Sequence, residues 1–275
     1  MTYETINVSP ATTHIGAEIS NVDLSGPLDN KTWDEIHQAF AAHSVIYFRD
    51  QSISVDDHIA FAEKFGKPEE PKKLPKYSPQ YPTVSLIEND GTKAVVGNRW
   101  HSDNSDYREP PLGVAMYAEV VPETGGDTLF ASMYAAHDAL SDRMKDILDG
   151  ATALHDNTNV QNYYKGAGVI VQDGMAVDEP SEHPIVRTHP VTGRKALFVN
   201  AVYTQSIVGF NKNESDALLA LLFTHLQAPD FAFRLRWQPG TLTLWDNRCV
   251  QHYASADYLG HRRMRRVVVG GDRPY

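Results

Sequence analysis

The sequence has little cysteine, no long hydrophobic run and no excess of basic charge. One cysteine among 275 residues excludes an intrachain disulfide and predicts a reducing environment. No apolar stretch approaches the roughly 20 residues that a membrane-spanning helix needs. The first residues also lack the basic and apolar segments of a secretion signal. We therefore expect a cytoplasmic protein without a membrane partner.

The charge balance of the chain is acidic. Asp and Glu number 35 against 25 for Lys and Arg, which gives a formal net charge of -10 at pH 7. Because nucleic-acid binding needs a basic surface that neutralises phosphates, we expect no nucleic-acid partner. The hydrophobic content of 41% is ordinary for a globular protein. With no internal repeat or Gly/Ser linker, the chain is expected to form a single domain over residues 1–275.

Helical and strand patterns alternate irregularly along the chain. Capping-box spacings predict helix starts at Thr32 with Glu35, at Ser54 with Asp57 and at Asn211 with Glu214. The corresponding helices are expected near residues 30–43, 54–66 and 213–226, with another helical stretch at 132–148. Short strands are expected at 44–48, 84–87, 114–118, 128–130, 196–199, 231–237, 241–245 and 264–269. This pattern indicates a mainly β fold with flanking helices (α+β), of the jelly-roll barrel type.

Three metal-ligand residues stand in two distant parts of the chain. His101 and Asp103 are two positions apart and would share one face of a strand. His252 follows the strand expected at 241–245, and a jelly roll can bring these segments face to face. Two imidazoles and one carboxylate can hold one face of Fe(II) and leave the opposite face open for chemistry. Among twelve histidines, however, a His-x-Asp pair alone arises easily by chance on a protein surface.

The remaining histidines and the cysteine have simpler interpretations. Cys249 precedes His252 by three positions, so in an extended segment it would point to the opposite face. It is interpreted as a small packed residue, not a ligand. The other histidines considered are expected to be structural or exposed: His37, His43, His58, His183 and His189.

An arginine-rich segment, Arg262–Arg266, runs directly into the apolar Val267–Val269. Strand alternation places Arg262 and Arg266 on one side and Arg263 and Arg265 on the other. Buried guanidinium groups are costly unless an anion meets them, and their planar fork suits carboxylate or sulfonate oxygens. The segment therefore predicts two anionic ligands, one at each inward arginine. The alternative is internal pairing with acids such as Asp246, Asp257 or Asp272.

Nine motifs together resemble the taurine dioxygenase family of Fe(II)/2-oxoglutarate-dependent oxygenases. They are Ile15–Ile19, Trp100–Asp103, Thr124–Leu129, His183–Pro190, Phe198–Asn200, Trp245–Arg248, His252–Ala254, Asp257–Tyr258 and the arginine segment. The resemblance implies a double-stranded β-helix, a cupin-like jelly roll. It also implies a homo-oligomer (dimer or tetramer) and a small anionic substrate. The implied cofactors are Fe(II), 2-oxoglutarate as cosubstrate, and O2.

The resemblance also implies roles for individual residues. His101, Asp103 and His252 would hold the iron, and Thr128 and Arg262 would bind the distal carboxylate of 2-oxoglutarate. Arg266 would meet an acidic group of the substrate. Counting forward from His252 would select Arg263 for the cosubstrate, whereas counting backward from Gly271–Asp272 selects Arg262. Strand alternation favours Arg262, because it keeps that arginine on the face of Arg266.

The positions expected near the substrate depart from a taurine-specific pattern. Residues 67–71 read Lys-Pro-Glu-Glu-Pro where a taurine-specific relative carries a sulfonate-binding histidine. Asn104 and Asp106 follow Asp103 at positions where an aromatic residue would be expected in a taurine-specific relative. Glu70, Asn104 and Asp106 are candidate substrate contacts, with surface exposure as the alternative. Residues 67–81, rich in Pro and Lys, are expected to form a mobile loop over the active site.

The resulting functional hypothesis is hydroxylation of a C–H bond in a sulfonate, sulfate ester or aryloxyalkanoate. Such a reaction could release sulfite, an alcohol or a phenol. One alternative keeps the chemistry and changes the substrate to a zwitterionic, amino-acid-like metabolite. A further alternative is a non-catalytic jelly-roll module that binds 2-oxoglutarate and a metal.

Overall fold

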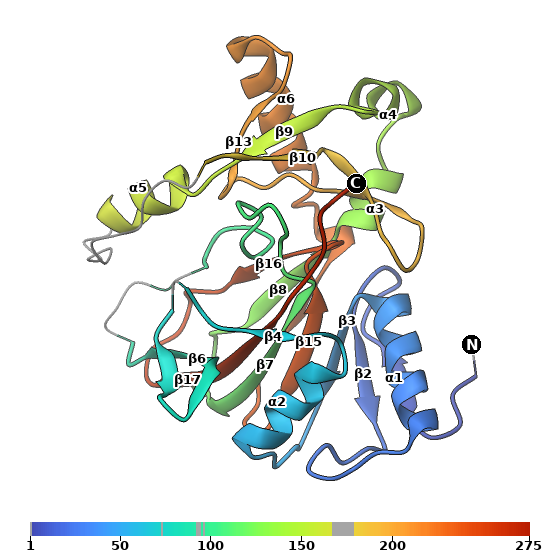
Figure 1. Cartoon of the computed structure of the whole chain (residues 1–275), viewed down its shortest axis with the longest axis vertical. Coiled ribbons are helices and arrows are strands. Elements are labelled where there is room, and N and C mark those ends of the chain that lie inside the picture. Colours follow the sequence, from blue (N-terminus) through green and yellow to red (C-terminus); the bar gives the residue numbers. More distant parts are fainter. Residues whose placement is uncertain (1, 73, 92–94, 96, 167–178) are drawn as a thin grey trace.

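Two β-sheets form the centre of the molecule (Figure 1). The computed structural model describes residues 2–72, 74–91, 95, 97–166 and 179–275. The larger sheet has the order β1 (Asn7–Pro10), β2 (Ala17–Ser20), β3 (Val45–Phe48), β15 (Leu242–Asp246), β7 (Gly113–Val120), β17 (Arg262–Val269), β6 (Tyr81–Asn89) and β5 (Lys76–Ser78), with β4 (Pro68–Glu69) paired to β17. The smaller sheet has the order β14 (Ala232–Leu235), β8 (Thr128–Ser132) and β16 (Val250–Ala254). Neighbouring strands are antiparallel, except that β2 and β3 run parallel.

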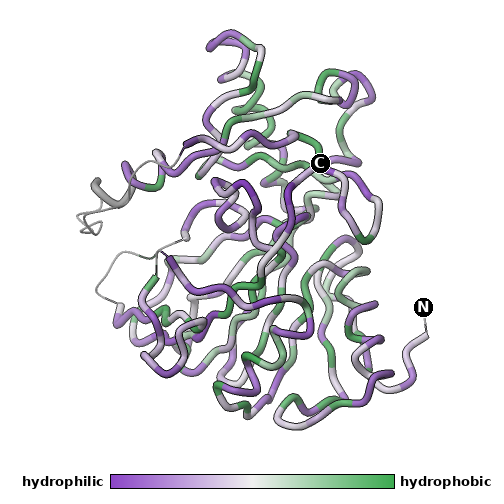
Figure 2. The backbone as a smooth tube through the Cα atoms, in the orientation of Figure 1, coloured by the Kyte–Doolittle hydropathy of each residue, from purple (hydrophilic) through white to green (hydrophobic). Residues whose placement is uncertain are grey.

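The two sheets enclose the main hydrophobic core. Met116 of β7 and Met264 and Val268 of β17 pack in this core with Phe130 of β8 and Val250 of β16. Hydrophobic residues follow the central strands, whereas many connecting segments are hydrophilic (Figure 2). This sandwich of two sheets around one core is the expected jelly-roll arrangement.

A second core covers the outer face of the larger sheet. Helices α1 (Asn30–His43) and α2 (Val55–Glu63) lie against this face, and Ile36 and Phe61 belong to one hydrophobic cluster with Val267 and Val269 of β17. Strand β17 therefore alternates as the sequence predicted. Met264 and Val268 face the inner core, and Val267 and Val269 face the helices.

The remaining elements gather at one end of the sandwich (Figure 1). They are α3 (Met133–Asp138), α4 (Asp142–Leu148), β9 (Thr152–His155), α5 (Thr158–Gly166), β10 (Ser181–Pro184), β11 (Val186–Thr188), β12 (Lys195–Leu197), β13 (Thr204–Ile207), α6 (Lys212–His225) and a short 3-10 helix (Pro229–Phe231). Strands β10, β9 and β13 form one small sheet, and β11 and β12 form another. Across the described parts of the chain, no helix combines the length and the apolar character needed to cross a membrane.

Some predicted element boundaries are wrong. The first helix is capped by Asp29, whose side chain accepts a hydrogen bond from the Thr32 amide at 2.7 Å, so the expected Thr32–Glu35 capping box is absent. The Glu35 carboxylate instead accepts hydrogen bonds from the amides of Glu4 and Thr5. The stretch 132–148 is divided into two helices. Residues 67–81, expected as a loop, contain β4 and β5, and the mobility of this stretch stays a prediction.

The other two capping boxes are confirmed. The side chain of Ser54 accepts from the Asp57 amide, and the Asp57 carboxylate accepts from the Ser54 amide at 2.8 Å. The same reciprocal pair joins Asn211 and Glu214 at the start of α6. Each box satisfies amides that a helix start leaves without intrahelical partners, which fixes both starts locally.

Candidate metal centre

A pair of backbone hydrogen bonds places His101 directly opposite His252. The His101 amide donates to the His252 carbonyl at 3.1 Å, and the His252 amide donates to the His101 carbonyl at 2.8 Å. Residues paired in this antiparallel way project their side chains to the same face. The two imidazole centroids are accordingly 4.2 Å apart.

Asp103 completes the cluster with both of its carboxylate oxygens. Its Oδ1 lies 3.8 Å from Nε2 of His101, and its Oδ2 lies 3.8 Å from Nε2 of His252. One ligand atom from each of the three residues lies within 4.8 Å of the others. The predicted convergence is therefore present, but a regular strand does not cause it. His101 forms an isolated bridge, and the chain turns just after Asp103, where Asn104 has a φ of 49°.

Two side chains attach the His101–Asp103 segment to the β15–β16 region, which carries His252. The Ser102 hydroxyl donates to the Val250 carbonyl at 2.8 Å. The Asn247 side-chain carbonyl accepts from the Asp103 amide at 3.4 Å and from the Trp245 indole at 3.1 Å. Sequence reasoning did not assign these two attachments. Their only signal was that Ser102 and Asn247 lie inside the motifs that contain the ligands.

The hydrogen bond of His101 and the lowered pKa of His252 suit a cation. Nδ1 of His101 lies 2.6 Å from the Arg99 carbonyl, so this nitrogen donates and the Nε2 lone pair faces Asp103. Burial, together with the nearby His101, lowers the pKa of His252 to about 3 and keeps that ring neutral.

The carboxylate of Asp103 remains ionised although it is largely buried. Burial alone would raise the pKa of Asp103, but the positive charge of the Arg266 guanidinium holds it well below its usual range. Its Oδ2 is buried and has no hydrogen-bond partner. A buried anionic oxygen facing imidazole nitrogens is satisfied by a metal ion, so the three residues fit a divalent cation.

Thr128 and Arg262 meet at a tryptophan that the sequence did not single out. The Trp237 indole donates to the Thr128 hydroxyl at 2.9 Å, and the Arg262 guanidinium lies 6.0 Å from the Trp237 ring centre. Nε of Arg262 donates to the Gly126 carbonyl at 3.1 Å, and burial lowers the pKa of this guanidinium. Among the described residues, no carboxylate lies within 4.0 Å of Arg262. This buried cation is therefore suited to bind an anionic ligand.

Arg263 lies apart from Arg262 despite being next to it in the chain. Its Nε donates to the Glu119 carboxylate at 2.6 Å, and its Nη1 lies 3.2 Å from Glu88. Its charge is thus balanced by protein carboxylates, whereas that of Arg262 is not.

Arg266 belongs to the cluster around Asp103. Its Nη2 lies 3.0 Å from Oδ1 of Asp103, and the side chain is buried on β17. The three acids considered as internal partners of the arginine segment pair elsewhere. Asp246 pairs with Arg248, Asp257 with Arg234 and Asp272 with Arg187.

The other candidate substrate contacts are placed less directly. Glu70 forms an exposed ion pair with Lys76 at 2.7 Å, and among the described residues no hydrogen bond or ion pair joins it to the cluster. Asp106 is buried, and its carbonyl accepts from the Ser181 hydroxyl. The ammonium of Lys72 lies 4.5 Å from the ring centre of Tyr107, so the 67–81 stretch contacts the turn that follows Asp103.

A second group of ligand-type residues is a structural network. The Asp246 carboxylate accepts from Arg248 at 2.8 and 2.7 Å and pairs with Nε2 of His189 at 3.0 Å. Nδ1 of His189 accepts from two backbone amides, which places the proton of the ring on Nε2. Burial raises the pKa of the neighbouring Cys249 to about 12. The network is internally satisfied, and Cys249 is a packed residue as expected.

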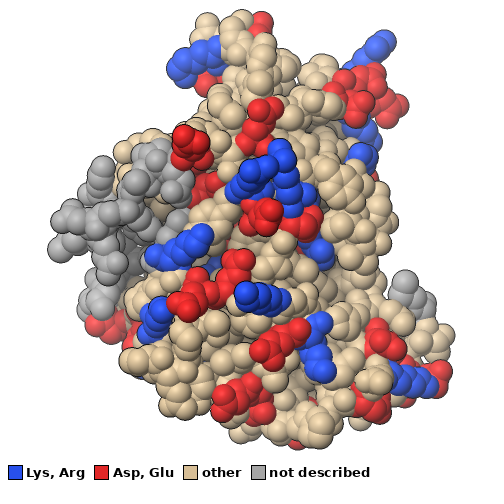
Figure 3. Space-filling model, viewed as in Figure 1, with Lys and Arg blue, Asp and Glu red and all other residues tan. Residues whose placement is uncertain are grey.

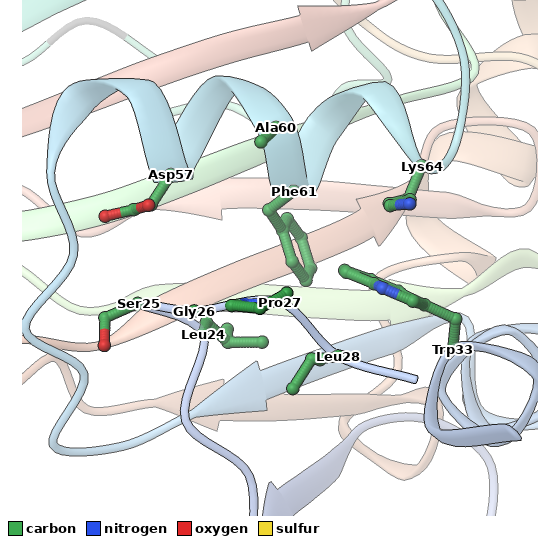
Figure 4. A pocket seen from close by; sticks show the side chains of 10 residues that line it. All are labelled: Leu24, Ser25, Gly26, Pro27, Leu28, Trp33, Asp57, Ala60, Phe61 and Lys64. Atoms are coloured by element: carbon green, nitrogen blue, oxygen red, sulfur yellow. The ribbon is translucent and has the colours of Figure 1, made fainter. Parts of the chain in front are cut away.

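One surface pocket lies away from the cluster of His101, Asp103 and His252. It is formed by the Leu24–Leu28 segment and residues of α1 and α2, and it contains no predicted site residue. Phe61 of α2 points onto this segment beside Trp33 of α1 (Figure 4). On the face in Figure 3, acidic and basic side chains are interspersed.

The chain is similar to known proteins over nearly its whole length. A sequence model of the "Taurine catabolism dioxygenase TauD, TfdA family" matches residues 7–268. An alkylsulfatase of Acinetobacter baylyi is 34% identical, with 95% of this chain and 84% of the relative covered. An alpha-ketoglutarate-dependent 2,4-dichlorophenoxyacetate dioxygenase of Cupriavidus pinatubonensis is 35% identical over 93% of this chain and 94% of its own.

A solved structure supports the same relationship. The crystal structure of AAD-2 in complex with Mn(II) and N-oxalylglycine superimposes with a TM-score of 0.82 at 30% identity, covering 98% of this chain and 99% of that one. The fold is accordingly the double-stranded β-helix of these dioxygenases. The chain belongs to the TauD/TfdA family, and it is a 2-oxoglutarate-dependent dioxygenase that uses Fe(II) and O2.

Proposed function

We propose that this dioxygenase hydroxylates a C–H bond in a small organic anion: a sulfate ester, a sulfonate or an aryloxyalkanoate. The observation that carries the proposal is the buried Arg266, which projects into the cluster of His101, Asp103 and His252. The named activities of the alkylsulfatase and the dichlorophenoxyacetate dioxygenase support this class of substrate. Hydroxylation of the carbon next to the ether oxygen of an aryloxyalkanoate would release a phenol and a carbonyl compound. Hydroxylation of the carbon next to the ester oxygen of a sulfate ester would release sulfate and an aldehyde.

His101, Asp103 and His252 are the proposed iron ligands. Two neutral imidazoles and one carboxylate on one side of an ion leave its other side open for exogenous ligands. Their convergence, and the buried oxygen of Asp103 without a hydrogen-bond partner, support this assignment.

Thr128 and Arg262 are the proposed partners of the distal carboxylate of 2-oxoglutarate. The Thr128 hydroxyl oxygen accepts a hydrogen bond from the Trp237 indole. The hydroxyl proton of Thr128 therefore points away from Trp237 and is free to be donated to a ligand. The fixed guanidinium of Arg262 offers the fork geometry that a carboxylate prefers.

When bound, Fe(II) and 2-oxoglutarate together supply O2 activation, coupled to decarboxylation of 2-oxoglutarate to succinate. The protein contributes position and shielding. Arg266 binds the anionic end of the substrate and thereby directs one C–H bond toward the three ligands. Buried residues such as Phe130 and Trp245, whose rings lie 6.2 and 4.8 Å from that of His252, exclude bulk water behind the cluster.

Substrate-dependent succinate release tests the proposed function. The assay screens sulfate esters, sulfonates, phenoxyacids and amino acids in the presence of Fe(II) and ascorbate. His101→Ala and His252→Ala should abolish succinate release, because each removes one of only three protein ligands. His14→Ala, which changes an exposed histidine, is the matched control. Full turnover in either ligand variant would refute the assignment, and succinate release only with amino acids would favour the zwitterionic substrate.

We also propose that the protein is a cytoplasmic homo-oligomer. The exposed apolar side chains of Val208 and Phe210, in the segment between β13 and α6, and of Leu221 on α6 support self-association through this part of the chain. Light scattering during size-exclusion chromatography measures the mass directly. A monomer at micromolar concentration would contradict the oligomeric part of the proposal.

A further inference from the structure

The two oxygens of Asp103 have different neighbours. Oδ1 lies 3.0 Å from Nη2 of Arg266 and 3.8 Å from Nε2 of His101. Oδ2 lies 3.8 Å from Nε2 of His252 and has no hydrogen-bond partner. One carboxylate can therefore hold the guanidinium through Oδ1 and a metal ion through Oδ2.

The guanidinium of Arg266 depends strongly on this carboxylate. Only 7% of Arg266 is exposed to solvent. Within the described parts of the chain, Asp103 is the one acidic residue within 4.0 Å of this group. The backbone of Arg266 is held from both sides, since it pairs with Ser85 of β6 and with Met116 of β7. The cation is thus confined next to the metal ligands.

A divalent metal and Arg266 would consequently share a single negative charge in a buried site. Their positive charges repel each other, and screening by water is weak where both groups are desolvated. An anion that pairs with the guanidinium offsets its charge and removes part of this repulsion. The same metal ion would then be held more tightly by Asp103 and the two histidines.

We propose that Arg266 couples substrate binding to metal binding, so that an organic anion at Arg266 tightens the hold of the three ligands on the divalent metal. This inference rests on the proposed function, because it places the substrate anion at Arg266. Coupling between two binding equilibria is reciprocal, so the metal also strengthens anion binding by the same factor. Without an anion at Arg266, the guanidinium weakens metal binding. With an anion bound there, the three residues bind the metal more tightly.

Metal affinity measured by calorimetry tests the coupling without any turnover. The metal-free full-length protein is titrated with Mn(II) alone, with Mn(II) plus hexyl sulfate, and with Mn(II) plus the neutral 1-hexanol. We expect hexyl sulfate to lower the Kd for Mn(II) by about fivefold or more, in the usual range of such couplings. 1-Hexanol should leave the Kd for Mn(II) unchanged, because it has the same alkyl chain as hexyl sulfate but no negative charge.

Arg266→Gln separates coupling from simple positioning. If Arg266 acts through its charge, this variant binds Mn(II) more tightly than the unchanged protein and no longer responds to hexyl sulfate. Arg266→Lys keeps the charge and should keep the response, which also provides a folded variant if the first is unstable. Arg263→Gln, on the same strand but paired with Glu88 and Glu119, should behave like the unchanged protein.

Three results would overturn the coupling: no binding of hexyl sulfate, the same Kd for Mn(II) with hexyl sulfate bound, or weaker Mn(II) binding by Arg266→Gln. The last would make Arg266 a positioning residue only. Succinate release distinguishes these failures from failure of the proposed function. Release with an anionic substrate leaves that function standing, whereas no release across the whole panel removes it.

Discussion

Two adjacent arginines on one strand face different electrostatic surroundings, and this difference predicts which one binds 2-oxoglutarate. Arg262 is buried beside Trp237 and, among the described residues, has no carboxylate within 4.0 Å, whereas Arg263 is paired with Glu88 and Glu119. Arg262→Ala should raise the KM for 2-oxoglutarate by about 30-fold or more, since a buried charge pair contributes about 2 kcal/mol or more.

Arg263→Ala is the matched comparison for this measurement. It removes an arginine from the same strand, and the KM for 2-oxoglutarate should change by less than about twofold, as for exposed ion pairs. A larger effect of Arg263→Ala than of Arg262→Ala would reverse the assignment.

The single cysteine should be chemically inert in the folded protein. Cys249 is 2% exposed, and burial raises the pKa of its thiol to about 12. Only the thiolate reacts with alkylating reagents, and a thiol with a pKa this high stays protonated at pH 8. Intact mass spectrometry after iodoacetamide treatment at pH 8 should therefore show unmodified native protein and one adduct after unfolding in urea. Rapid labelling of the native protein would show that the thiol is accessible.

At the level of elements, the turn between β15 and β16 holds Asp103, the proposed carboxylate ligand of the metal. Asn247 in this turn accepts hydrogen bonds from the Asp103 amide and from the Trp245 indole. Groups that orient metal ligands typically contribute about 10-fold to 100-fold in metal affinity. Asn247→Ala should therefore raise the Kd for Mn(II) by about 10-fold.

Calorimetry with Mn(II) checks this effect independently of turnover. Asn247→Asp keeps an oxygen acceptor and should restore part of the affinity. Asn213→Ala, an exposed change at the start of α6, serves as the control. Equal metal affinity in Asn247→Ala and the unchanged protein would show that the turn holds Asp103 by other contacts.

Elements whose signals are local could be predicted from the sequence. The capping boxes at Ser54 and Asn211 depend on residues three positions apart, and both are present. The alternation of β17 likewise follows from its own residues. The Thr32–Glu35 box failed because Glu35 is engaged by amides from a segment some 30 positions earlier, which local spacing cannot reveal.

The site shows the same division between local and distant information. His101, Asp103 and His252 were identifiable as ligand-type residues within recurring motifs. The roles of Trp237 and Asn247 become visible only when distant strands are paired, because each contacts a residue far away in the sequence. Strands as short as β9, β10 and β13 were missed for this reason too, because β10 and β13 each pair with β9 across a long separation in the sequence.

For the whole molecule, the position of the three proposed ligands predicts that metal binding stabilises the fold. His101 and Asp103 lie far from His252 in the chain, so the three-ligand site exists only when β16 and the His101–Asp103 segment are docked. A ligand that binds only the native state adds about 2.7 kcal/mol when its concentration is 100 times its Kd. For a chain of this size that corresponds to an increase in Tm of about 5 °C or more.

Thermal unfolding with and without Mn(II) and N-oxalylglycine measures this stabilisation. His252→Ala should remove most of the increase in Tm, because two ligands from one short segment do not link the two parts of the chain. Arg262→Ala should remove only the part that N-oxalylglycine adds. An equal increase in Tm in the unchanged protein, His252→Ala and Arg262→Ala would place the stabilising metal elsewhere. A metal held by His101, Asp103 and His252 needs both segments of the chain, so removing His252 must reduce its effect on Tm.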